Sequence, residues 1–217
     1  MIRALLFDSD GVLVDTEPLF FDATRIAFAS AGANLSREQW ARWYLAEAKH
    51  SGEIADQLGL GESRRQTALA ERDRLFWTRM DEGVPIFPGV VETLQTLARR
   101  FRLAVVTGAP RKRFERIHAS TNLCPFFETI VACDEHEYAK PHPWGYRTVL
   151  ERLGLKPEEC LAVEDSPRGA VAAVSAGIAC CVIPTPLTLR TLCPPECAIL
   201  NDFTQLIPFL DEENRNP

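Results

Sequence analysis

Short runs of apolar residues recur along most of the chain and alternate with amphipathic stretches. The apolar runs cover residues 2–7, 103–107, 129–132, 160–164, 179–183 and 198–200. Near-continuous runs of this kind are typical of parallel strands that are covered on both faces. Helical periodicity fills residues 90–99, 111–120, 144–153 and 168–175 between them. The alternation predicts an α/β fold built on a doubly wound parallel sheet.

The segment from residue 15 to residue 85 has a different pattern, because it contains no strand-like run. Helical periodicity begins at Pro18, and a capping box at Ser36 opens a second helix. Two more helical stretches follow before residue 81. We therefore predict an α/β core domain, residues 1–14 and 86–217, interrupted by an all-helical domain, residues 15–85.

Composition narrows the class of protein further. Hydrophobic residues make up 46% and charged residues 25% of the 217 positions, as in soluble globular proteins, and the formal net charge is −6. With no basic excess, we expect no nucleic-acid or membrane partner, and an anionic substrate would need local cations or a metal. No apolar run reaches the ~18 residues of a membrane span, and acidic residues interrupt the first run too early for a signal peptide.

The seven cysteines show no spacing typical of a zinc site, and most lie in apolar runs. We expect them to be reduced and structural in a cytoplasmic protein. Cys193 and Cys197, which flank Pro-Pro-Glu, are the one pair whose role the sequence leaves open.

Paired carboxylates follow the first predicted strand. Asp8 and Asp10, two positions apart, leave a strand on the same side, and Gly11 would allow the chain to turn away sharply. Two such carboxylates repel each other unless a cation lies between them. A solvated acidic turn would explain this segment alone, but ligands of open α/β sheets bind beyond the carboxyl ends of the strands.

Three later segments also place polar residues at or near strand ends. They are Thr107-Gly108, Lys140 between Ala139 and Pro141, and the acidic pair Glu164-Asp165. Each is weak by itself, since a helix cap or a surface charge would account for it. If the first and fourth strands are neighbours, their carboxylates converge on a site that suits a hard cation, most naturally Mg²⁺.

Taken in this order, the four segments resemble the motifs of the haloacid dehalogenase (HAD) superfamily of phosphotransferases. Residues 8–17, Asp-Ser-Asp-Gly-Val-Leu-Val-Asp-Thr-Glu, match the first motif. Thr107-Gly108 matches the second, Lys140-Pro141 the third and Glu164-Asp165-Ser166 the fourth. A helical insertion directly after the first motif is similar to the cap domain of the subgroup that holds phosphoglycolate phosphatases, sugar-phosphate phosphatases and β-phosphoglucomutases.

The resemblance implies a role for each matched residue. Asp8 would attack phosphorus to form an aspartyl-phosphate, and Asp10 would protonate the leaving oxygen and then activate water. Thr107, the Gly108 N–H and Lys140 would bind the transferring phosphoryl group.

The resemblance also implies a metal site. Mg²⁺ would lie among the Asp8 carboxylate, the Asp10 carbonyl and Asp165. Glu164 would bind the metal directly or through water, and Ser166 would support the site from beside it.

The reaction class follows from these residues, with alternatives. We expect a Mg²⁺-dependent phosphatase that acts on a small phosphorylated metabolite of the sugar phosphate or phosphoglycolate type. Dehalogenases lack the second Asp of the first motif, so Asp10 argues against a dehalogenase. The mutase branch of the family usually carries a His early in the first cap helix. No His follows soon after Glu17 here, which favours a phosphatase over a β-phosphoglucomutase-like mutase. A non-enzymatic phosphoacceptor and an inactive binding protein are more remote alternatives.

The cap would set specificity, which the core motifs leave open. Residues 47–53 resemble the cap stretch that reaches into the site of related phosphatases, so Lys49 and His50 are candidate specificity residues. An ordinary helix–helix turn is the alternative for this stretch. We expect the insertion to move on hinges near residues 14–16 and 83–88. We also expect a monomer or a weak homodimer. The sequence does not identify the substrate.

Overall fold

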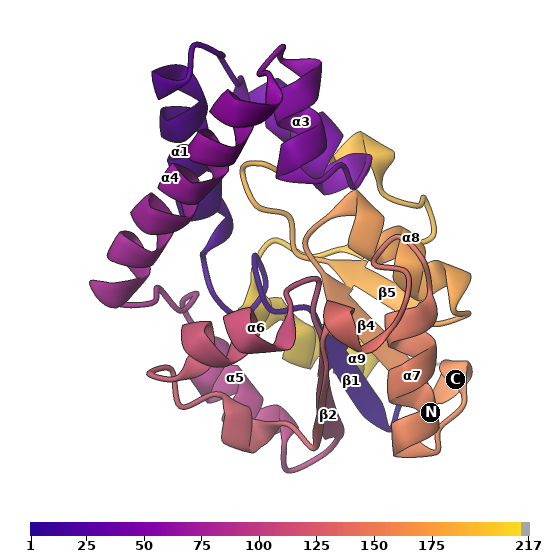
Figure 1. Ribbon diagram of the computed structural model, residues 1–217. Helices are drawn as coiled ribbons and strands as arrows, with labels where there is room; N and C mark the ends of the chain where they lie inside the picture. The colour runs from indigo at the N-terminus through magenta and orange to yellow at the C-terminus, as the bar shows by residue number, and fades with distance from the viewer. Residues whose placement is uncertain (214–217) are drawn as a thin grey trace.

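Six parallel strands form one sheet in the order β3-β2-β1-β4-β5-β6 in the computed structural model, which describes residues 1–213 (Figure 1). The strands are β1 (Ala4–Phe7), β2 (Arg102–Val106), β3 (Thr129–Val131), β4 (Cys160–Glu164), β5 (Ala179–Val182) and β6 (Ala198–Ile199). Each coincides with one of the predicted apolar runs, although β2 begins one residue before its run. The predicted doubly wound parallel sheet is therefore confirmed, and the last four residues of the predicted core domain lie outside the described residues.

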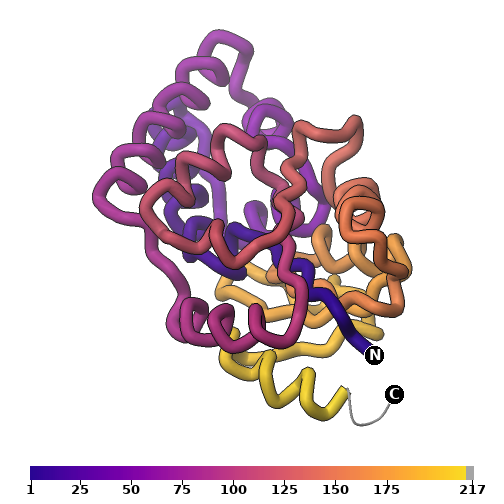
Figure 2. Tube along the Cα trace, turned by 90° about the horizontal axis from the view of Figure 1, so that it is seen from below, coloured from indigo at the N-terminus to yellow at the C-terminus, as the bar shows by residue number. Residues whose placement is uncertain are grey.

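Helices cover both faces of this sheet. Alternate residues of a strand therefore belong to two different hydrophobic clusters, one on each face. Leu5 and Phe7 of β1 pack with α5 (Val90–Leu97), α6 (Arg111–His118) and α9 (Leu206–Glu213). Ala4 and Leu6 face α7 (Trp144–Leu153) and α8 (Pro167–Ser175) on the other side. Figure 2 shows α9 beside α5 at the border of the molecule. Among the described residues, no helix combines the length and apolar character needed to cross a membrane.

The segment between β1 and α5 is helical, apart from its connecting turns. It contains α1 (Glu17–Ser30), α2 (Arg37–Trp40), a π-helical turn η1 (Ala41–Ala46), α3 (Ser51–Gln57) and α4 (Glu62–Asp81), which together we call the helical insertion. The long helices α1 and α4 pack along each other (Figure 1). The Ser36 capping box is present, since Ser36 Oγ accepts from Gln39 N at 3.1 Å and Gln39 Oε1 accepts from Ser36 N at 2.9 Å.

One hydrophobic cluster continues from the sheet into the helical insertion. It joins Phe7 of β1 to Phe20 and the fully buried Trp40 of the insertion. The ring of Trp40 stacks on Tyr44 with centroids 4.1 Å apart. Because buried apolar residues are continuous across the junction, the exact boundaries of a core and a cap domain stay a prediction.

The two connections to the helical insertion lie side by side. Asp15 N donates to the Pro85 carbonyl at 2.8 Å, and Phe87 N donates to the Leu13 carbonyl at 3.2 Å. Entry and exit of the insertion therefore form a short antiparallel pair of segments, at residues 13–15 within the first motif and at residues 85–87.

Candidate active site

The carboxyl ends of β1 and β4 bring three acidic side chains together. Asp8 follows β1, Glu164 ends β4, and Asp165 comes next. Each offers a carboxylate oxygen within 4.8 Å of those from the other two. Pairing of β1 with β4, which sets Phe7 beside Val163, produces this convergence. The structure therefore meets the condition that the first and fourth strands are neighbours and brings three of the four carboxylates together, whereas Asp10 is not part of this group.

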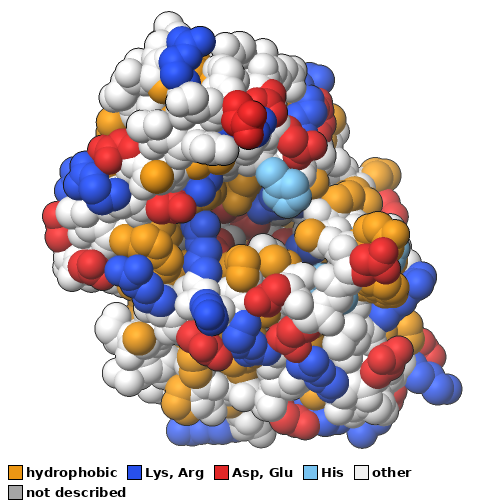
Figure 3. Space-filling view, in the orientation of Figure 1, with side chains coloured by type: hydrophobic (Ala, Val, Ile, Leu, Met, Phe, Trp, Pro, Cys, Tyr) orange, Lys and Arg blue, Asp and Glu red, His pale blue; other side chains and the backbone are white. Residues whose placement is uncertain are grey.

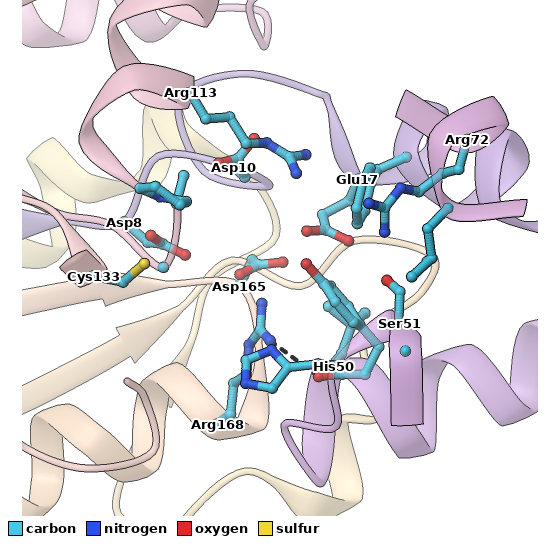
Figure 4. Close-up of a pocket in the computed structure, with 18 residues that line it drawn as sticks. Asp8, Asp10, Glu17, His50, Ser51, Arg72, Arg113, Cys133, Asp165 and Arg168 are labelled. Carbon is cyan, nitrogen blue, oxygen red and sulfur yellow. Dashed lines mark hydrogen bonds between the residues drawn. The ribbon is translucent and has the colours of Figure 1, made fainter. Parts of the chain in front are cut away.

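The cluster faces a cavity of about 360 Å³ between the sheet and the helical insertion. Figure 3 shows its mouth at the surface, with basic side chains along one side. The core contributes Asp8, Asp10, Gly108, Ala109, Pro110, Arg113, Cys133, Asp165 and Arg168 to the lining. The insertion contributes Glu17, Phe20, Tyr44, Leu45, His50, Ser51, Gly52, Leu69 and Arg72. A substrate bound here would meet both parts of the chain at once (Figure 4).

The chain can turn after Asp10 because residue 11 is glycine. Gly11 has a φ of +85°, in the left-handed region that other residues rarely adopt. A side chain at this position would also collide with the Asp165 carboxylate. Gly11 therefore permits both the turn and the close approach of the first and fourth motifs.

Lys140 supplies a buried cation next to Asp8. Its Nζ lies 3.1 Å from Asp8 Oδ1 and donates to Glu164 Oε1 at 2.6 Å and to the Val106 carbonyl at 2.7 Å. Burial opposes this charge, but the carboxylates of Asp8 and Glu164 outweigh burial and raise the pKa of Lys140 above its usual value. Tyr146 also donates to Glu164 Oε1, at 2.5 Å. Glu164 therefore holds the ammonium next to Asp8.

The acidic cluster fits a divalent cation. Asp165 Oδ2 and Glu164 Oε2 are buried and accept no hydrogen bond from the described residues. Burial, together with the charge of Asp8, raises the pKa of Asp165 well above its usual value. Buried, unpartnered carboxylate oxygens are costly unless a positive charge compensates them, and oxygen ligands suit hard cations. Asp8 and Asp165 would bind such an ion, and Glu164 would lie next to it.

The remaining residues of the first two motifs also lie at this edge of the sheet. Asp10 lines the cavity, and Thr16 Oγ1 donates a hydrogen bond to Asp10 Oδ1. Gly108 lines the cavity too, while the Thr107 hydroxyl accepts from Ala109 N at 3.0 Å. The second motif is therefore a tight turn just before α6, next to the acidic cluster.

Ser166 caps the helix that follows the fourth motif. Its side chain accepts a hydrogen bond from Gly169 N at 3.4 Å, at the N-terminus of α8. A Cβ at Gly169 would overlap the Glu164 carboxylate, so α8 lies directly against that side chain. Ser166 thus supports the position of the acidic pair from the side.

Besides Arg72, which pairs with Asp73, three charged residues with no role in the sequence-based prediction line the cavity (Figure 4). Glu17 is buried, its Oε2 has no hydrogen-bond partner among the described residues, and burial raises its pKa to about 7. Arg113 lies over Phe20 at 4.2 Å from the ring centroid. Arg168 donates to the Tyr44 carbonyl at 3.2 Å. Among the described residues, neither guanidinium has a carboxylate within salt-bridge distance.

Of the two predicted specificity residues, only His50 lines the cavity. Lys49 Nζ is bound elsewhere, at 2.8 Å from Gln57 Oε1 and 3.1 Å from Glu47 Oε2. The backbone turns sharply just before it, because Ala48 has a φ of +58°. The structure therefore brings His50 into the site and leaves the Lys49 ammonium outside it.

The raised pKa values lead to a prediction about metal and pH. Burial raises the pKa of Glu164 from 4.5 to about 7, and that of Asp165 also rises. Between pH 4.5 and about 7, Glu164 keeps a proton in the metal-free fold that it has already lost in the unfolded chain. The free energy of unfolding therefore falls as pH rises through this range. A divalent metal needs the ionised forms. We expect Mg²⁺ to raise the melting temperature more at about pH 8 than at about pH 5, and equal increases would contradict this.

The chain matches the family described as haloacid dehalogenase-like hydrolase over residues 2–177. It is 36% identical over 187 residues to a phosphorylated carbohydrates phosphatase from Thermotoga maritima, with 82% of each chain covered. It is 28% identical over 202 residues to hexitol phosphatase B from Escherichia coli, with 85% of each covered.

Solved structures agree with this match. The crystal structure of CbbY from Rhodobacter sphaeroides in complex with phosphate superposes with a TM-score of 0.77 at 29% identity. The superposition covers 95% of this chain and 96% of that one. With the four motifs gathered at one edge of the sheet, the resemblance is confirmed: the chain belongs to the haloacid dehalogenase-like hydrolases.

Proposed function

We propose that this chain is a Mg²⁺-dependent phosphatase that hydrolyses a small phosphorylated metabolite through an aspartyl-phosphate on Asp8. The observation that carries the proposal is that Asp8 lies next to both the Lys140 ammonium and the buried Asp165, in a cavity that Asp8, Asp10 and Asp165 line. The chemistry needs a nucleophile, an acid and compensation of phosphoryl charge, and these residues supply all three.

Asp8 is the group placed to attack phosphorus. One of its oxygens lies 3.1 Å from Lys140 Nζ, so the ammonium can also bind an equatorial oxygen of the transferring group. The Gly108 backbone faces the same space and offers a further place for that group. Bound Mg²⁺ would cancel the repulsion between a carboxylate and a phosphate dianion. These contacts matter most in the transition state, where negative charge spreads over the phosphoryl oxygens.

Asp10 is the group placed to protonate the leaving oxygen. It lines the cavity between Asp8 and the helical insertion, and the buried Thr16 hydroxyl holds it. After the alcohol leaves, the same carboxylate can take a proton from the water that attacks the aspartyl-phosphate. The fixed carboxyl thus serves both halves of the reaction.

The leaving group would occupy the outer cavity, beside Glu17, Arg113 and Arg168. Guanidinium and carboxylate groups together suit an oxygen-rich leaving group of the sugar-phosphate or phosphoglycolate type. Relatives named for phosphorylated carbohydrates and hexitols agree with the sugar-phosphate class.

A panel of phosphate esters, assayed with Mg²⁺ for release of inorganic phosphate, tests the proposal. We expect phosphate release from at least one small sugar phosphate or from phosphoglycolate. Interconversion of sugar phosphates without phosphate release would indicate the mutase instead. Binding without any turnover would indicate a binding protein.

Arg113 offers a prediction about specificity. Arg113→Met keeps an unbranched apolar side chain of similar length but removes the guanidinium that lies over Phe20 and lines the outer cavity. We expect kcat/KM for the best natural substrate to fall ~10- to 100-fold, with hydrolysis of a small aryl phosphate changing far less. Arg116→Met is the matched control, since Arg116 lies on the same helix and stacks on Trp77 outside the cavity lining. Equal losses on both substrates would remove Arg113 from leaving-group recognition.

A further inference from the structure

A buried histidine contacts the residue between the two catalytic aspartates. Ser9 is fully buried, and its Oγ lies 2.8 Å from Nε2 of His118, the last residue of α6. His118 is itself only 4% exposed. Because side chains alternate along an extended chain, Ser9 points away from the cavity that Asp8 and Asp10 face. The contact therefore fixes the catalytic segment from behind.

The neighbours of the imidazole define its hydrogen bonds. Thr121 Oγ1 lies 3.0 Å from His118 Nδ1, and the same hydroxyl donates to the His118 carbonyl at 3.3 Å. With the hydroxyl proton assigned to that carbonyl, Nδ1 carries the hydrogen and Nε2 is the acceptor. Ser9 Oγ–H therefore donates to Nε2. Burial lowers the pKa of His118 to about 4, so the ring is neutral around pH 7.

We propose that His118 is a positioning residue for Asp10, acting through Ser9; this rests on the phosphatase function proposed above. Ser9 is the base of the turn that carries Asp10, because its carbonyl accepts from Val12, Leu13 and Val14 N at 3.3, 2.9 and 3.2 Å. Asp10 itself is held by the Thr16 hydroxyl. If Ser9 shifts, the whole turn shifts and the Asp10 carboxyl moves away from the leaving oxygen.

The same helix ties this contact to phosphate binding. α6 begins just after the Thr107-Gly108 turn, carries Arg113 on the cavity and ends at His118. The ring of Phe114, one turn earlier, lies 4.4 Å from that of His118 and fills the space beside it. One helix therefore follows the second motif directly and contacts the residue between the two aspartates.

Substrates with different leaving groups separate positioning of an acid from general support of the fold. An alkyl phosphate needs protonation of its leaving oxygen, whereas p-nitrophenyl phosphate leaves well without it. We expect His118→Leu to lower kcat/KM ~10- to 100-fold for the alkyl phosphate but only a few-fold for p-nitrophenyl phosphate. Because kcat/KM covers steps up to loss of the alcohol, later dephosphorylation does not mask the difference.

Two amide variants provide matched controls. The longer amide side chain introduced by His118→Gln can reach the place of Nε2 and accept from Ser9, whereas the shorter amide of His118→Asn reaches only the place of Nδ1. We expect the glutamine variant to restore most of the alkyl phosphate activity and the asparagine variant to behave like the leucine variant. Ser9→Ala, which removes the donor, should reproduce the leucine pattern if the leucine variant does not fold. Melting temperatures establish that each variant is folded.

Asp10→Asn distinguishes failure of this proposal from failure of the proposed function. If Asp10→Asn lowers alkyl phosphate turnover selectively, Asp10 is the acid, and adding His118→Leu should then cost little more because both changes act on one step. Equal losses on both substrates in folded His118 and Ser9 variants, or full additivity with Asp10→Asn, would overturn the positioning role alone. An Asp10→Asn variant without leaving-group dependence would overturn the acid role itself, and the positioning role with it.

Discussion

Asp8→Asn should leave the protein folded and without measurable turnover, a loss of roughly 10⁴-fold or more. The amide has the size of the carboxyl but cannot attack phosphorus. Lys140 also pairs with Glu164, at 2.6 Å, so its buried ammonium keeps a carboxylate partner when Asp8 is replaced. Steady-state phosphate release with saturating Mg²⁺, together with the melting temperature, measures the effect.

A carboxylate elsewhere on the chain provides the control for this change. Asp22 on α1 is exposed and pairs with Arg25, so Asp22→Asn should keep full activity. If folded Asp8→Asn retained more than a few per cent of the activity, Asp8 would not be the nucleophile.

Asp165→Ala should weaken Mg²⁺ activation far more than Ser166→Ala does. Asp165 brings a buried, unpartnered oxygen to the acidic cluster, whereas Ser166 caps α8 beside it. We expect the Mg²⁺ concentration for half-maximal activity to rise roughly 100-fold or more for Asp165→Ala and roughly 10-fold for Ser166→Ala. Titration of activity with Mg²⁺ in each variant gives both values.

Chelation completes the metal test. A strong chelator should abolish phosphate release from the native protein, and excess Mg²⁺ should restore it. Full activity in the chelator would exclude the acidic cluster as a catalytic metal site.

The strand pattern predicted the sheet outright and the acidic cluster on the condition that β1 and β4 are neighbours. Parallel strands that are covered on both faces have recognisable apolar runs, and their carboxyl ends share one edge. Once β1 and β4 are neighbours, Asp8, Glu164 and Asp165 must approach each other. The strand pattern alone does not say which strands are neighbours. The adjacency of β1 and β4 therefore had to come from the family resemblance or from the structure.

The outer cavity was less predictable, because it depends on how the helical insertion lies on the core. Arg113 and Arg168 sit on core helices, and only their contacts with Phe20 and Tyr44 of the insertion show that they line the site. Arg168 follows the fourth motif closely, which is the one sequence signal that could have identified it. Ala48, just before Lys49 and His50, has a left-handed backbone conformation that the periodicity could not show. The sequence pattern therefore could not tell that His50 lines the cavity while Lys49 does not.

The central claim, a covalent intermediate on Asp8, is tested most directly by trapping it. Protein mixed with substrate and Mg²⁺ is quenched with acid within a single turnover and digested, and the peptide that contains Asp8 is analysed by mass spectrometry. We expect one added phosphoryl group on Asp8, absent from Asp8→Asn and from unmixed protein. A phosphoryl group on another residue, or phosphate release in the first turnover with no phosphorylated peptide at any quench time, would contradict the mechanism.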